Sequence, residues 1–166
     1  LGLGAGWNRK EMEHHGVDYD SRYQRMMDQI RALKTIWRDD IAEHDGPFVQ
    51  FGPMRSWPKP AQRPHPPLFI GGESIHTLRR VVAECDGWLP RARDPQQVLD
   101  NIPVLQRMAA EAGRSINITV FACPPDPEWV SKFHAAGVDR LIFMLNEGDR
   151  DKTLERLDRF AGLAGA

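Results

Sequence analysis

The sequence predicts an α/β fold built around a parallel sheet, and three observations support this. From residue 68 onward, short apolar runs alternate with segments of helical apolar spacing, four times in succession. Two of the helical segments open with a capping residue followed by proline, at Asp94-Pro95 and Asp126-Pro127. The run Leu141–Leu145 is apolar at every position, which is typical of a parallel strand covered on both faces.

The elements of this region can be placed one by one. Strands are expected over residues 68–70, 87–89, 116–122 and 138–145, and helices over 74–85, 95–112, 127–136 and 151–163. Strands that alternate with helices form parallel sheets. Gly113 and Gly137 stand where glycine commonly ends a helix. Pro103 lies inside an expected helix, so we expect that helix to kink or divide there.

The first 38 residues supply a further unit of the same kind. Residues 1–7 resemble the end of a strand, after which Asn8 is expected to cap a short helix and Asp20 a longer one. Apolar residues recur at three- and four-residue steps from Tyr23 to Trp37, which predicts one buried helix face. Five βα units form either an open doubly wound sheet or the last five units of an eight-stranded barrel.

Residues 39–67 interrupt this pattern, and we interpret them as an insertion within one partial domain that spans residues 1–166. A hairpin is expected over 43–51, with its turn at Asp45-Gly46-Pro47. Residues 52–67 contain six prolines, which exclude a helix or a central strand. This proline-rich strap either lines the mouth of a ligand site, with Trp57 and His65, or is an exposed connection.

Composition and charge disfavour several functional classes, including nucleic-acid-binding and membrane-spanning proteins. The net charge is −1 and no basic block is present, which disfavours nucleic-acid binding. No apolar run approaches the roughly 20 residues of a membrane span, so we expect no membrane insertion and a cytoplasmic location. Cys85 and Cys123 lie in unrelated segments and are expected to be buried. Neither they nor the scattered histidines show the spacing of a metal site.

The most informative stretch is Gly71-Gly72-Glu73-Ser74, where an expected strand leads directly into a helix. The first amides of a helix lack intrahelical acceptors and carry the positive end of its dipole. A phosphate is therefore expected to accept hydrogen bonds from the amides of residues 72–75 and from the hydroxyls of Ser74 and Thr77. The alternative is that the two glycines only make a tight turn between strand and helix.

Several motifs in this order resemble the luciferase-like monooxygenase family, and most closely its deazaflavin-dependent branch. The motifs are Gly4-Ala5-Gly6-Trp7-Asn8, Gly16-Val17-Asp18, the strap from Trp57-Pro58 to Pro66-Pro67, Gly71-Gly72-x-Ser74 and Asp86-Gly87-Trp88-Leu89-Pro90. The resemblance runs over nearly the whole chain. It implies a TIM barrel that binds FMN or coenzyme F420, of which this chain resembles strands four to eight.

The resemblance also implies a set of cofactor-binding residues. The backbone of Gly71 and Gly72, with Glu73, Ser74 and Thr77, is expected to hold the cofactor phosphate. At the end of the first strand, Gly4, Ala5 and Gly6 are expected to lie against the cofactor. Trp7 stands where some deazaflavin enzymes of the family carry a glutamate. We assign no catalytic acid or base, because the family's first three strands usually supply it and this chain does not match them.

The expected function is hydride transfer between coenzyme F420 or FMN and a small organic substrate, with monooxygenation as a further outcome if the cofactor is FMN. The alternative is a truncated, non-catalytic half-barrel that serves in assembly or binds a phosphate ligand. We expect the isolated chain to be incomplete as an enzyme. Its partner would be either a second copy of itself or the missing amino-terminal half of the barrel.

Overall fold

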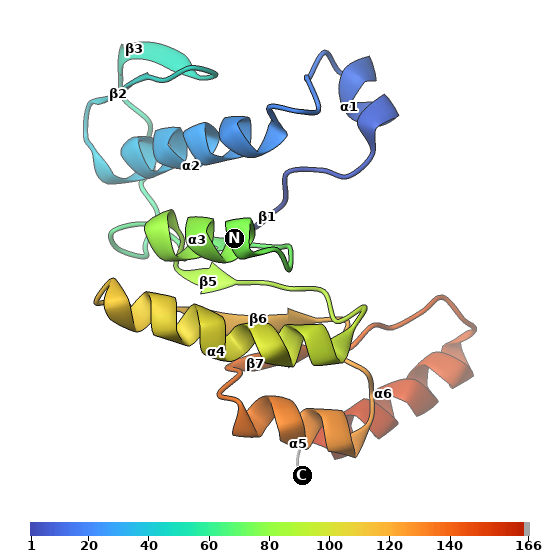
Figure 1. Cartoon of the computed structure of the whole chain (residues 1–166). Coiled ribbons are helices and arrows are strands. Elements are labelled where there is room, and N and C mark those ends of the chain that lie inside the picture. Colours follow the sequence, from blue (N-terminus) through green and yellow to red (C-terminus); the bar gives the residue numbers. More distant parts are fainter. Residues whose placement is uncertain (165–166) are drawn as a thin grey trace. The chain divides into compact units, whose positions relative to one another are not determined.

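The computed structural model describes residues 1–164 and divides them into two compact units (Figure 1). The first unit comprises Leu1 and Leu3–Pro67, and the second comprises Gly2 and the chain from Leu68 onward. The elements in chain order are β1 (Gly2–Leu3), α1 (Arg9–His14), α2 (Arg22–Arg38), β2 (Ala42–Asp45), β3 (Gln50–Met54), β4 (Phe69–Ile70), α3 (Ile75–Glu84), β5 (Gly87–Trp88), α4 (Pro95–Glu111), β6 (Asn117–Phe121), α5 (Pro127–Ala135), β7 (Arg140–Ile142) and α6 (Arg150–Ala164).

The two helices of the first unit begin in different ways. The Asn8 side chain accepts a hydrogen bond from the Glu11 amide at 3.4 Å, which confirms the expected cap of α1. The expected cap of α2 at Asp20 is wrong, because the helix begins after Ser21. Asp18 organises this start instead, since its carboxylate accepts from the amides of Asp20 and Ser21 at 3.2 and 3.0 Å.

Helix α2 buries one face and anchors the insertion. Met26, Met27 and Ile30 are buried on it, as the apolar spacing predicts. At its carboxyl end, Lys59 of the strap donates to the carbonyl oxygens of Ile36 and Asp39 at 2.6 and 2.5 Å. The last carbonyls of a helix have no partner within it, so Lys59 ties the strap to the end of α2.

The hairpin is confirmed, with β2 and β3 paired antiparallel, but β3 extends to Met54 and so includes residues 52–54, which the proline content assigns to the strap. One carboxylate attaches the hairpin to α2. Asp28 is 1% exposed. Its Oδ1 lies 2.8 Å from His44 Nε2, and its Oδ2 accepts from the amides of Phe48 and Val49, each at 2.9 Å. A Cβ at Gly46 would lie 2.1 Å from Asp28 Oδ1, so the hairpin turn has room only for glycine.

The second unit contains the sheet. Its strand order is β1-β4-β5-β6-β7, and the pairs β4–β5, β5–β6 and β6–β7 are parallel. Helices α3, α4 and α5 lie side by side along the strands (Figure 1). The core between them includes Leu78, Trp88, Leu105, Val120 and Phe133, each fully buried. The predicted α/β fold with a parallel sheet is therefore confirmed.

Two expectations about this unit need correction. Helix α4 does not divide at Pro103 but runs from Pro95 to Glu111, because Pro103 lies on its exposed side, where water can bind the carbonyl that proline leaves without a donor. Strand β7 ends at Ile142, and Met144 and Leu145 are 41% and 42% exposed. Met144 and Leu145 therefore lie beyond the end of the strand and are partly exposed, so the apolar run does not continue as a covered strand.

Cys85 and Cys123 are buried and unbridged, as expected. Burial raises the pKa of the Cys123 thiol to about 11, so this thiol stays protonated at neutral pH. Among residues 1–164, the structure contains no helix with both the length and the apolar character needed to cross a membrane.

Candidate functional site

The turn between β4 and α3 has a backbone that requires glycine. Gly72 has φ = +109°, a region that side chains rarely adopt. A Cβ at Gly72 would lie 2.9 Å from Thr77 Oγ1, and a Cβ at Gly71 would lie 3.1 Å from the Leu89 carbonyl oxygen. Both positions therefore keep the backbone bare at the carboxyl end of β4.

Ser74 caps α3 as the sequence predicts. Its Oγ accepts a hydrogen bond from the Thr77 amide at 3.2 Å and lies 3.2 Å from Thr77 Oγ1. Thr77 is 2% exposed, so its hydroxyl faces Ser74 and not solvent. The amides of Glu73 and Ser74 donate to no protein acceptor within residues 1–164. This turn thus presents unused N–H donors next to a hydroxyl, which is a donor set that suits an anion.

We expect Ser74→Ala to lower the free energy of unfolding by about 0.5–2 kcal/mol even without a ligand, because the cap is lost. Denaturant unfolding of the 166-residue chain measures this. Ser131→Ala is a matched control, since Ser131 is exposed within α5 and its replacement should change stability by less than about 0.5 kcal/mol. Equal effects of the two substitutions would contradict the capping role.

Two further groups hold Glu73. Its Oε1 accepts a hydrogen bond from the Arg91 amide at 2.9 Å, and its carbonyl oxygen accepts from Asn101 Nδ2 at 2.8 Å. Arg91 follows β5, and Asn101 lies on α4. The Glu73 carboxylate is thus engaged with a backbone amide of its own unit, and its contribution to an anion site would come from its main chain.

The Asp86-Gly87-Trp88 motif supports the same turn from β5. Asp86 Oδ2 accepts from the Leu68 amide at 2.8 Å, where β4 begins. A Cβ at Gly87 would lie 2.0 Å from Cε1 of the Phe69 ring, so only glycine fits beneath that ring. Trp88 is fully buried, and its Nε1 donates to the Gly72 carbonyl oxygen at 2.8 Å. Each residue of the motif therefore fixes β4 or the turn that follows it.

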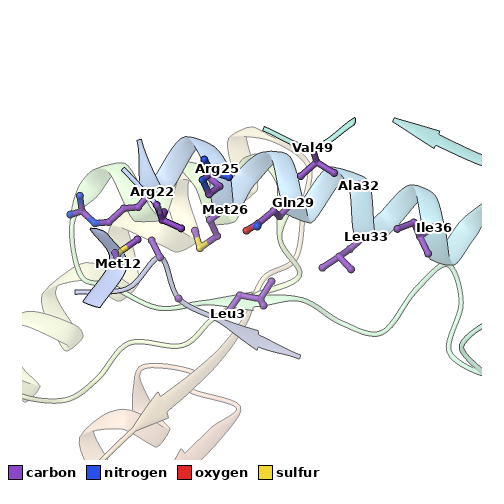
Figure 2. Close-up of a pocket in the computed structure, with 13 residues that line it drawn as sticks. Leu3, Met12, Arg22, Arg25, Met26, Gln29, Ala32, Leu33, Ile36 and Val49 are labelled. Carbon is purple, nitrogen blue, oxygen red and sulfur yellow. The ribbon is translucent and has the colours of Figure 1, made fainter. Parts of the chain in front are cut away.

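The first unit contains a separate pocket of about 480 Å³, which falls in the range of small-molecule sites. Gly4 and Ala5, two of the residues expected to lie against a cofactor, line it. Figure 2 shows Met26 and Leu33 of α2 pointing toward Leu3 across the pocket. The third expected residue, Gly6, is not among those that line the pocket. Its φ is +86°, and a Cβ there would lie 2.8 Å from Met12 Sδ.

Two arginine side chains contribute polar, positively charged groups to the lining of this mostly apolar pocket. Arg22 and Arg25 both line it, and the Nε atom of each is buried without a hydrogen-bond partner among the described residues. The guanidinium groups are held by aromatic rings, since Arg22 lies 3.7 Å from the ring centre of Tyr19 and Arg25 lies 4.8 Å from that of Phe48. Unused buried donors favour an acceptor, so the pocket suits a ligand with an apolar body and an acceptor group.

The eight predicted cofactor-binding residues thus fall into two local groups. Gly71, Gly72, Glu73, Ser74 and Thr77 form one continuous site in the second unit, and Gly4, Ala5 and Gly6 belong to the first. Two residues that bind the turn, Trp88 and Asn101, were not among the predicted ones. Trp88 could have been found, because it lies in the Asp86-Gly87-Trp88 motif, whereas nothing in the local sequence distinguishes Asn101. Trp7, at the position where some deazaflavin enzymes carry a glutamate, is 84% exposed.

Comparisons with known proteins bear on this site. A family model described as luciferase-like monooxygenase matches residues 1–134. An uncharacterised protein of Mycobacterium tuberculosis is 30% identical over 164 residues, which cover 97% of this chain and 57% of that protein. An FMNH(2)-dependent dimethylsulfone monooxygenase of Pseudomonas putida is 31% identical over 121 residues, covering 71% of this chain and 33% of that protein. The chain therefore spans little more than half the length of the first of these relatives.

Solved structures give the same picture at lower identity. The coenzyme F420-dependent tetrahydromethanopterin reductase of Methanopyrus kandleri matches with a TM-score of 0.69 and 14% identity, covering 93% of this chain and 70% of that one. An F420-dependent secondary alcohol dehydrogenase matches with a TM-score of 0.61 and 16% identity, covering 98% of this chain and 60% of that one. At such identities the likeness shows the fold alone, and it confirms the predicted partial TIM barrel of the luciferase-like type.

Proposed function

Since this chain belongs to the luciferase-like monooxygenase family, we propose that its turn from Gly71 to Thr77 holds the phosphate of a flavin-type cofactor in an oxidoreductase. The observation that carries the proposal is the turn itself, with its bare glycines, its unused amides and the Ser74 hydroxyl. Relatives named for FMNH2 and for coenzyme F420 support a cofactor of this type. When bound, either cofactor supplies the redox chemistry, which is hydride transfer for the deazaflavin.

Main-chain and side-chain atoms of the turn would bind the phosphate in different ways. The amides of Glu73 and Ser74 donate to the phosphate oxygens, and the Ser74 hydroxyl adds a donor when it turns from Thr77. Thr77 is buried, and its hydroxyl lies 3.2 Å from the Ser74 hydroxyl. It would therefore orient Ser74 and not contact the phosphate itself. The Arg91 amide binds the Glu73 carboxylate, so this residue would contribute to phosphate binding through its main-chain N–H. Hydrogen bonds of amides to a phosphate are charge-assisted and therefore among the stronger ones in proteins.

In the first unit, Gly4, Ala5 and Gly6 would allow a flat ligand to approach the backbone closely. The pocket that Gly4 and Ala5 line has the size and the apolar character of a site for a small organic molecule. Arg22 and Arg25 would offer their free Nε donors to an acceptor group on it. We propose that a small organic substrate is reduced or oxidised by hydride exchange. If the cofactor is FMN, the alternative outcome is monooxygenation, with molecular oxygen as the co-substrate and the reduced flavin as the source of two electrons.

The whole enzyme would comprise more than this chain, because the relatives are longer than the part it matches. We propose that the acid or base of the reaction comes from strands outside the 166 residues. The chain would work either in a homo-oligomer or joined to the amino-terminal part of the barrel, in the cytoplasm. As a half-barrel alone it would bind a phosphate ligand without turnover.

The proposal is tested by measuring how strongly the 166-residue chain prefers a phosphorylated flavin. Equilibrium dialysis would give the Kd for FMN and for riboflavin in the same buffer, and for F420 and its phosphate-free deazaflavin. Charge-assisted hydrogen bonds are worth about 1.5–3 kcal/mol each, so the phosphorylated member of one pair should bind at least about tenfold more tightly. Equal binding within both pairs would refute the assignment of the turn as a phosphate site.

A further inference from the structure

We infer that Trp88 and Asn101 are positioning residues for this anion site: by holding the carbonyl oxygens of Gly72 and Glu73, they aim the amides of Glu73 and Ser74 at the ligand. The inference rests on the proposed function and deepens it, because it names what orients the donors. Neither side chain need touch the ligand. Each acts through a peptide group that it binds on the opposite side.

The geometry of the peptide bond determines where these two amides point. In a planar trans peptide, the carbonyl oxygen of one residue and the N–H of the next point in opposite directions. Trp88 Nε1 donates to the Gly72 oxygen at 2.8 Å, so the Glu73 N–H points away from the indole. Asn101 Nδ2 donates to the Glu73 oxygen at 2.8 Å, so the Ser74 N–H points away from the carboxamide. Two consecutive amides are thereby turned away from the side chains that hold their peptides.

The side chains of Trp88 and Asn101 are themselves held in place by secondary structure. Trp88 is fully buried in β5, which pairs with β4 on one side and β6 on the other. Asn101 is partly buried on the 17-residue helix α4, 28 positions away from Glu73 in the sequence. Groups that stand on strands and helices keep their geometry better than groups on loops. The Arg91 amide, which binds the Glu73 carboxylate, is a third tether on the same residue.

Such tethers are needed because glycine makes the turn adaptable. At Gly72 the backbone has no Cβ to restrict it, so a peptide flip that presents oxygen in place of N–H is sterically open. A flipped peptide would direct a partial negative charge at an anion. The hydrogen bonds from Trp88 and Asn101 select the orientation that presents N–H, so the site is organised before the ligand arrives.

The test compares ligands that differ only in the phosphate. Asn101→Leu removes the carboxamide donor with little change of volume, and Gln97→Leu removes an exposed carboxamide from the same helix as the matched control. The readout is the ratio of the riboflavin Kd to the FMN Kd for the 166-residue chain. We expect Asn101→Leu to lower this ratio about three- to tenfold, the worth of one neutral hydrogen bond, with an unchanged riboflavin Kd. Gln97→Leu should leave the ratio as it is.

Two further measurements, the Kd ratio of a Trp88→Phe variant and the binding of inorganic phosphate, can refute the positioning role. Trp88→Phe keeps an aromatic ring in the core and removes the N–H donor together with part of the indole volume, so it should lower the same ratio. Both variants should weaken the binding of inorganic phosphate. If the variants fold and retain the full ratio, the positioning role is wrong while the phosphate site stands. If the unaltered chain shows no preference for FMN or F420 over their phosphate-free forms, the proposed function fails and this inference with it.

Discussion

Gly72→Val is expected to abolish the preference for FMN or F420 over their phosphate-free forms. The φ of +109° at this position is strained for any side chain, and the new Cβ would approach Thr77 Oγ1 to 2.9 Å. The turn must therefore shift, and its amides lose their orientation. Backbone strain of this kind costs about 1–3 kcal/mol, so the melting temperature should also fall. Dialysis against each cofactor and a thermal melt measure the two effects.

Gly113→Val is the matched control for this substitution. Gly113 also has a positive φ, +63°, but a Cβ there would meet no atom within 4 Å, and it lies after α4, away from the turn. It should lose a similar amount of stability and keep the ligand preference. A Gly72→Val protein that binds FMN as the unaltered chain does would show that the bare backbone at this turn does not serve the cofactor.

Asp28→Ala is expected to lower the free energy of unfolding by about 3–5 kcal/mol, the range for removing one member of a buried pair. The carboxylate holds His44 and two amides of the hairpin turn, and all three donors would lose their acceptor. Denaturant unfolding measures the effect. Asp40→Ala, which removes an exposed carboxylate just beyond α2, should cost less than about 0.5 kcal/mol. Similar losses for both would contradict the anchoring role of Asp28.

The same carboxylate gives the first unit a defined response to acid. Burial alone would raise the pKa of Asp28, but the hydrogen bonds from His44 and from the amides of Phe48 and Val49 outweigh it and lower that pKa below its ordinary value. A lowered folded-state pKa stabilises the protein above the unfolded-state value and loses this effect as the pH falls through the folded one. The stability difference between the unaltered chain and Asp28→Ala should therefore be present at neutral pH and shrink below about pH 4 as Asp28 becomes protonated.

The parts of the fold that the sequence predicts well depend on short-range chemistry. Asp94 and Asp126 cap α4 and α5 by accepting from amides three and two residues ahead, at 3.1 and 2.8 Å respectively, and such caps can be predicted from the local sequence. The end of β7 at Ile142 could not be predicted, because the apolar run to Leu145 does not show where the strand stops pairing. Asp20 was misassigned as a cap because Asp18, two residues earlier, offers the same chemistry.

The residues of the candidate site likewise separate into those that the local sequence predicts and those that depend on contacts between distant segments. Gly71, Gly72 and Ser74 could be predicted, since a strand, two glycines and a capping residue follow one another directly. Asn101 could not, because its approach to Glu73 depends on how α4 packs beside the β4 turn. Asp28 could not be predicted as a hairpin anchor either, since its partners lie 16 to 21 residues away along the chain. Side chains that join distant segments become recognisable only when those segments are in place.

The bond from Trp88 to Gly72 also gives the turn its own spectroscopic label. In a ¹⁵N-edited NMR spectrum each tryptophan contributes one indole resonance, and the chain has five. Trp7 and Trp57 are 84% and 64% exposed, so their indole protons should exchange rapidly with deuterated water. The Trp88 proton is buried and hydrogen-bonded to the Gly72 oxygen, so its signal should outlast theirs. Its chemical shift would then follow any change in the Gly72–Glu73 peptide as phosphate is titrated in, without an added dye or a mutation.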